Sequence, residues 1–126
     1  MLLRYSKLIS FLLILFFCSS LYAEDILIIH QGYGNTHSKH KNRLENAGHT
    51  VTMQNTSSSY SYTAGDFDQV YDIRYSYTSY STADKDRFKT VLSNGGTVYF
   101  VGENGNFDAR NDAIVSFIQE VTGDNN

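Results

Sequence analysis

The sequence has no apolar run long enough to cross a lipid bilayer, which takes about 20 residues of helix. Its longest run, Leu8 to Phe17, is shorter and follows two basic residues, Arg4 and Lys7. Small residues come after this run and end at Ala23. Such an order is typical of a cleavable secretory signal. We therefore expect residues 1–23 to be removed, which predicts an exported protein, periplasmic or secreted, without a membrane segment.

The residues leave three alternatives to this interpretation open. Cleavage after Ser20 is a second choice, and an uncleaved segment would be a membrane anchor. Cys18 suggests a lipoprotein, but Phe16 and Phe17 stand where a lipid-attachment site would need small residues.

Cysteine and positive charge are both scarce. Cys18 is the only cysteine and lies within the predicted signal, so the mature chain would have no disulfide, cysteine–zinc site or thiol nucleophile. The 10 Lys and Arg residues are outnumbered by 13 Asp and Glu, and loss of Arg4 and Lys7 with the signal changes the net charge from −3 to −5. Nucleic acids and anionic membranes bind clustered basic residues. We expect neither as a partner.

Short apolar segments separated by turns and helical patterns make up the rest of the chain. Ile26–Ile29 is a continuous aliphatic run, as in strands buried on both faces, whereas Thr50–Gln54 alternates and predicts an edge strand. The predicted strands are Ile26–His30, Thr50–Gln54, Phe67–Arg74 and Thr97–Val101. The predicted helices begin at Asn35 or Thr36, at Ser81 or Thr82, and at Asp108, and they end before Gly48, at Asn94 and near Thr122.

This order predicts an α/β domain with a small doubly wound parallel sheet, flavodoxin-like with strand order 2-1-3-4 and helices on both faces. Residues 24–126 suffice for one domain. Residues 55–66 are polar and low in complexity, which indicates a surface loop, although a degenerate crossover is expected in the same region.

Helical spacing also predicts which residues face the core. These residues are His37, His40, Leu44 and Ala47 in the first helix, Phe88, Val91 and Leu92 in the second, and Arg110, Ile114, Phe117, Ile118 and Val121 in the last. Thr97–Val101 is expected to be a second strand buried on both faces.

Two segments resemble a known superfamily. Asp68–Asp72 (DQVYD) is followed by a predicted helix and then by Ser93–Glu103 (SNGGTVYFVGE). This arrangement resembles the class I glutamine amidotransferase-like superfamily of flavodoxin-like folds, over roughly Asp25 to Val121. The resemblance implies a site after the strand Thr97–Val101, where catalytic members carry a Gly-x-Cys-x-Gly nucleophile elbow, with a His and an acid later in the chain.

The chain departs from that catalytic pattern at Gly102–Asn106. Asn104 stands at the nucleophile position, Asn106 replaces the last glycine, and no histidine follows. The resemblance therefore implies the fold and the site location but argues against thiol chemistry. Known members are longer and have at least one further strand, so a domain truncated at its C-terminal end is a second interpretation.

In open parallel sheets, ligands bind outside the carboxyl ends of the strands. Polar and aromatic residues at those ends are therefore the candidate ligand-binding residues. They are His30, Gln31, Tyr33, Arg74, Tyr75, Glu103, Asn104, Arg110 and Asn111. A structural alternative is that Glu103 pairs with Arg74 or Arg110.

We expect binding of a small molecule or an envelope protein, without catalysis and without a cofactor. If the protein is an enzyme, Glu103 and His30 are the candidate acid–base pair of a hydrolase. Flavin binding is a further alternative, because Gly34-Asn35-Thr36 resembles the end of the phosphate loop of flavodoxin.

Two other patterns allow both a functional and a structural interpretation. His30, His37 and His40 suggest a zinc site, but packing or capping explains them as well, so no metal is expected. The tyrosines between Tyr60 and Tyr80 lie among Ser and Thr, as in adaptable binding faces, but solvated loops would have the same composition.

Overall fold

The structure is a computed structural model that describes residues 23–32, 35–56, 61–75, 79–102, 105–106 and 108–124. The predicted signal, apart from Ala23, lies outside these ranges. The strands are β1 (Asp25–His30), β2 (Thr50–Asn55), β3 (Gln69–Asp72) and β4 (Thr97–Phe100). The helices are α2 (Asn35–Asn46), α3 (Thr82–Ser93) and α4 (Asp108–Thr122), with a short 3-10 helix, η1 (Ala64–Asp66).

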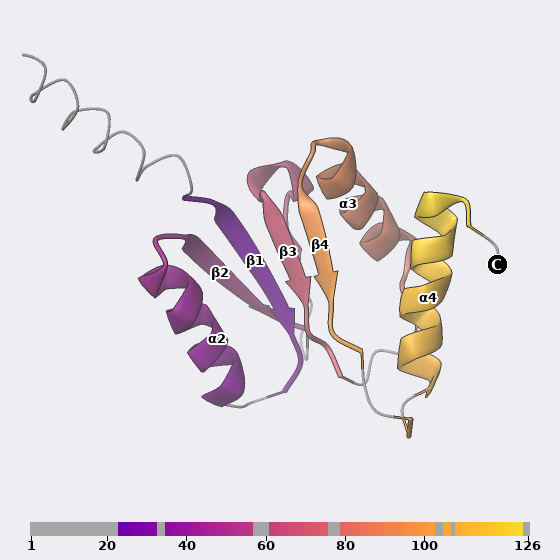
Figure 1. Ribbon diagram of the computed structural model, residues 1–126, viewed down its shortest axis with the longest axis horizontal. Coiled ribbons are helices and arrows are strands. Elements are labelled where there is room, and N and C mark those ends of the chain that lie inside the picture. Colours follow the sequence, from indigo (N-terminus) through magenta and orange to yellow (C-terminus); the bar gives the residue numbers. More distant parts are fainter. Residues whose placement is uncertain are drawn as a thin grey trace, which may run out of the picture.

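The four strands form one parallel sheet in the order β2-β1-β3-β4. Helix α2 covers one face, and α3 and α4 cover the other (Figure 1). Ile28 pairs with Met53 of β2 on one side and with Tyr71 of β3 on the other, which makes β1 a central strand. The predicted α/β class, parallel pairing and strand order are confirmed.

The larger core lies between the sheet and helices α3 and α4. Leu27, Ile29 and Val70 point to this side from the central strands. They meet an aromatic group in which Phe88 lies 5.4 Å from Phe100, measured between ring centroids. Burial of these aliphatic and aromatic side chains is the main force that holds the two helices on the sheet.

The opposite face is covered only in part. Ile26, Ile28 and Val51 are buried beneath α2, which packs over β1 and β2. On the same face of β4, Tyr99 is 43% exposed, and Val101, just after the strand, is 47% exposed. The prediction that Thr97–Val101 is buried on both faces is therefore wrong for this face, because β4 is an edge strand and α2 lies on the other half of the sheet.

The connection from β2 to β3 contains the short crossover that the sequence left open. Within its described part, η1 forms and Ala64 is buried against the core beneath α3. Asn55, the first residue of the predicted loop, is instead the last residue of β2.

Among the described residues, no helix is long and apolar enough to span a membrane.

Backbone sterics require glycine at the two positions between α3 and β4. Gly95 has φ +84°, which ends α3 in the left-handed region. A Cβ on Gly96 would lie 2.6 Å from the Asp68 carbonyl oxygen and 2.8 Å from Val91 Cγ1. The Thr97 amide donates to that same carbonyl at 2.9 Å. Only glycine therefore lets β4 start this close to the entry of β3.

The helix ends and faces were predicted with mixed success. The sequence predicted Ser81 or Thr82 as the start of α3. The N-cap is Ser81, which forms a capping box with Asp84. The cap side chains proposed for α2 lie outside what the structure describes. Ala47 follows α2 and is exposed. Three apolar residues predicted to face the core are also exposed: Leu92, Ile118 and Val121.

Candidate functional site

A buried charge network lies at the carboxyl end of β3. Asp72 accepts two hydrogen bonds from the Arg74 guanidinium, one from Nε and one from Nη2, both at 2.8 Å, and a third from the Arg74 backbone amide at 3.2 Å. Arg110 on α4 approaches the same carboxylate at 3.4 Å, and its Nη1 donates to the Tyr80 hydroxyl at 2.5 Å. Asp84 of the α3 capping box lies 3.6 Å from Arg74. The two aspartates and two arginines are at most 2% exposed.

Among the described residues, this network has as many acidic as basic side chains, so these charges compensate one another inside the core. Arg74 and Arg110 were candidate ligand-binding residues, and the structure places both guanidinium groups in the interior, away from solvent. Among the described residues, their carboxylate partners are Asp72 and Asp84. The predicted alternative partner, Glu103, lies outside the described residues, as do Tyr33 and Asn104.

Tyr80 completes the network from the loop before α3. Burial, together with the nearby Asp72 carboxylate, raises the pKa of Tyr80 far above its usual value. Its ring also contacts Phe88 at 5.4 Å between centroids, and the Arg110 guanidinium lies 5.3 Å from the ring centroid. Tyr80 is thus a core residue that joins the charge network to the aromatic core.

The other described candidates lie in two places. At the end of β1, His30 and Gln31 are half-buried, and exposed Tyr75 reaches toward Gly32, where its hydroxyl would be 3.2 Å from an added Cβ. On α4, Asn111 lies against Gly102, with Oδ1 3.1 Å from the position of an added Cβ. The described candidates therefore do not form one site: His30, Gln31 and Tyr75 lie near the end of β1, Asn111 lies on α4 against Gly102, and both arginines are buried.

His30 is half-buried and contacts His37, with 4.8 Å between ring centroids. Burial first, and the neighbouring His37 second, lower the pKa of His30 below 6.5. The described residues contain no group of three or more His, Cys, Asp or Glu side chains that could hold a metal ion.

The lowered pKa of His30 predicts how stability depends on pH. Below 6.5 the unfolded chain takes up a proton that folded His30 resists, so stability falls as the pH drops through 6.5 toward the lower folded pKa. We expect His30→Gln to show a smaller loss of stability between about pH 8 and about pH 5. Urea unfolding at several pH values across this range measures the loss of stability of both proteins. Equal pH slopes for the parent and the variant would assign the loss to other groups.

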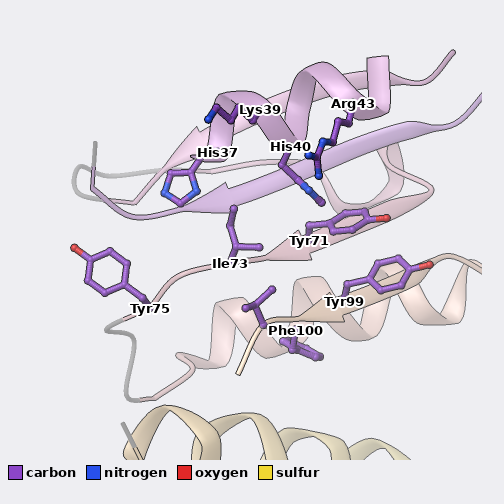
Figure 2. Close-up of a pocket in the computed structure, with 10 residues that line it drawn as sticks. His37, Lys39, His40, Arg43, Tyr71, Ile73, Tyr75, Tyr99 and Phe100 are labelled. Carbon is purple, nitrogen blue, oxygen red and sulfur yellow. The ribbon is translucent and has the colours of Figure 1, made fainter. Parts of the chain in front are cut away.

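A cleft opens between α2 and the uncovered half of the sheet, with a volume of about 690 Å³ (Figure 2). We call it the α2–β4 cleft. Its α2 wall consists of His37, Lys39, His40 and Arg43. The sheet side consists of Tyr71, Ile73, Tyr75, Tyr99, Phe100 and Val101. A cleft of this size lies in the range of small-molecule sites in proteins.

Two stacked tyrosines form the floor of the cleft. Tyr71 of β3 and Tyr99 of β4 pair in the sheet register, and their rings stack with centroids 4.5 Å apart and planes at 22°. His40 meets Tyr71 edge-on at 5.3 Å between centroids. Figure 2 shows His40 and Arg43 extending from α2 toward this pair. The floor is therefore a largely apolar aromatic surface, held by adjacent strands.

The charge of the cleft is one-sided. Its described lining contains Lys39, Arg43 and two histidines but no Asp or Glu. Elsewhere on the surface lysines are paired, for example Lys85 and Lys89 with Glu120. Within the described part of the chain, neither Lys39 nor Arg43 has a carboxylate within salt-bridge distance. The cleft thus presents basic groups that no carboxylate of the described residues neutralises.

The sequence placed the site at the carboxyl edge of the sheet but missed most of the cleft. Among the described ligand-binding candidates, Tyr75 is the one that lines it, and His30 contacts the wall through His37. Lys39 and Arg43 are four residues apart, and Tyr71 and Tyr99 occupy equivalent positions on neighbouring strands. The helical spacing was visible in the sequence, whereas the pairing of the two tyrosines required the sheet register.

Comparisons with protein-family models, with curated proteins and with solved structures find no match to this chain. The resemblance to the amidotransferase-like superfamily therefore stands on the two sequence segments that suggested it.

Proposed function

We propose that this protein is an exported, non-catalytic α/β domain that binds a small ligand in the α2–β4 cleft, as a diverged amidotransferase-like member without the nucleophile. The observation that carries the proposal is the cleft itself, with an aromatic floor and an unneutralised basic wall beside the carboxyl edge of the sheet. Apolar clefts with a few converging polar groups are the usual form of small-molecule sites.

The lining favours binding over catalysis. Hydrolytic catalysis by a side-chain nucleophile needs a hydroxyl, thiol or carboxylate next to a base. The described lining of the cleft offers histidines as bases, and its only hydroxyls are the weakly nucleophilic phenols of its tyrosines; it contains no Ser, Thr, Cys, Asp or Glu. Arg74 and Arg110, which could stabilise a developing negative charge, are held in the core by Asp72.

The test is a fragment screen by nuclear magnetic resonance on the exported protein. We expect bound fragments to shift the signals of Tyr71, Tyr99, His37 and His40 together, because these side chains line one cleft. Tyr99→Ala should weaken binding of those fragments by about fivefold, since stacking on an aromatic ring contributes about 1 kcal/mol. Val115→Ala, on the exposed face of α4, is the control and should leave binding unchanged.

Two results would contradict the proposal. Fragments that bind only elsewhere, with no signal change at the cleft, would remove the assigned site. Turnover in a hydrolase panel that disappears in both Glu103→Gln and His30→Gln would instead support the enzyme alternative. Flavin mononucleotide belongs in the screen, because its binding is visible as a change in its absorption.

A further inference from the structure

We propose that the ligand of the α2–β4 cleft is a planar aromatic anion, such as an aromatic carboxylate. This inference rests on the proposed function and adds the chemistry of the ligand. Two independent features of the cleft carry it: the basic wall on α2, which selects charge, and the tyrosine floor on β3 and β4, which selects shape.

The wall selects an anion because its charges lack partners. Lys39 and Arg43 are four residues apart on α2, so they project from neighbouring turns of the same side. Both are exposed, and no carboxylate lies within salt-bridge distance of either among the described residues. A carboxylate can accept hydrogen bonds from the two-pronged guanidinium of Arg43, a geometry that an ammonium group does not offer.

The surrounding charge sharpens this selection. The whole chain carries a net charge of −3, yet the described lining of the cleft has only basic and uncharged side chains. A concave site of one charge sign concentrates small ions of the opposite sign. The acidic remainder of the surface opposes long polyanions, which need an extended basic surface. The occupant is therefore a small anion.

The floor selects a flat ring because such a ring can continue its aromatic stack. Tyr71 and Tyr99 stack face to face with their planes 22° apart, and Tyr99, on the edge strand, is 43% exposed. A planar aromatic ring can stack on the outer face of Tyr99 or meet the edges of the pair. Ile73 and Val101 border the floor with apolar surface. A puckered ring would lose the stacking contact.

Four matched probes separate charge from shape. They are 2-naphthoate, neutral 2-naphthamide, cationic 2-naphthylmethylammonium and the saturated anion decahydro-2-naphthoate. We expect 2-naphthoate to bind most tightly, by about tenfold over the amide, because a hydrogen bond to a charged acceptor is stronger than one to a neutral acceptor. Isothermal titration calorimetry at low salt gives the four values of Kd. Added salt should weaken the binding of 2-naphthoate more than that of the neutral amide.

Variants assign each preference to its residues. Lys39→Gln/Arg43→Gln should abolish the preference for the naphthoate over the amide. Lys85→Gln/Lys89→Gln is the matched control, because it removes two charges at the same spacing from α3 and should leave the preference intact. Tyr99→Leu should abolish the preference for the flat over the saturated anion.

The outcomes distinguish this inference from the function on which it rests. If the amide or the cation binds as tightly as the naphthoate, or if both double variants weaken it equally, the cleft is a binding site that does not select anions. Equal binding of the flat and saturated anions would overturn the aromatic part. If none of the four probes binds and the fragment screen also leaves the cleft signals unchanged, the proposed function itself fails.

Discussion

Replacing Asp72 by Asn is expected to lower the free energy of unfolding by about 3–5 kcal/mol. Asp72 is fully buried, holds Arg74 through two hydrogen bonds of 2.8 Å, and lies 3.4 Å from Arg110. An amide in its place leaves Asp84, 3.6 Å from Arg74, as the remaining carboxylate of the network among the described residues. An uncompensated charge in the core is costly because it has lost its hydration without gaining a counter-charge.

Urea unfolding measures this loss, with Asp86→Asn as the matched control. Asp86 lies on the exposed side of α3, and the same substitution there should change stability by no more than about 0.5 kcal/mol. Domains of this size are stable by about 5–15 kcal/mol, so Asp72→Asn should leave a fold close to its unfolding threshold. Equal losses for the two variants would mean that the network is hydrated in solution.

A double variant tests whether the loss comes from the unpaired cation. Arg74→Met in the Asp72→Asn background removes one of the two guanidinium groups that Asp72 compensates. The combined loss should therefore be smaller than the sum of the two single losses, because residues of one network do not act independently. Additive losses would show that the aspartate and the arginine stabilise the fold separately.

Replacing Phe88 by Ala is expected to lower the free energy of unfolding by about 3–5 kcal/mol. Phe88 is fully buried, and its ring centroid lies 5.4 Å from Tyr80, 5.4 Å from Phe100 and 5.5 Å from Phe117. The substitution removes a ring at the centre of this group and leaves a cavity that the rigid sheet cannot close. These contacts join α3, α4 and β4, so the loss should be cooperative.

The comparison is Tyr99→Leu on the opposite face of the sheet. Tyr99 is partly exposed and stacks on Tyr71 alone among the described aromatic residues, so its replacement should cost about 0.5–1.5 kcal/mol. Thermal and urea unfolding of both variants measures the difference. A large difference would show that the cleft floor can be changed without unfolding the core, which the binding experiments require. Similar losses would place Tyr99 in the core.

The sequence by itself determined the elements, their order and the pairing of the strands. Ile26–Ile29 is an uninterrupted aliphatic run, which is found where both faces of a strand are covered, and helices between such runs enforce parallel pairing. Ser81 marks the start of α3, and Gly95-Gly96 marks its end, because capping and backbone sterics act over a few residues. These signals are local, so the sequence alone is enough to read them.

Only the tertiary structure decided which charges are buried and which apolar residues are exposed. Arg74 ends a strand and resembles a solvent-facing ligand residue, yet Asp72, Asp84 and Tyr80 enclose it. Tyr99 and Val101 belong to the apolar segment that the sequence predicts as a buried strand, but α2 covers the other half of their sheet face, which leaves the α2–β4 cleft open. Burial depends on which element packs over a residue, and that is set by contacts between segments distant in the chain.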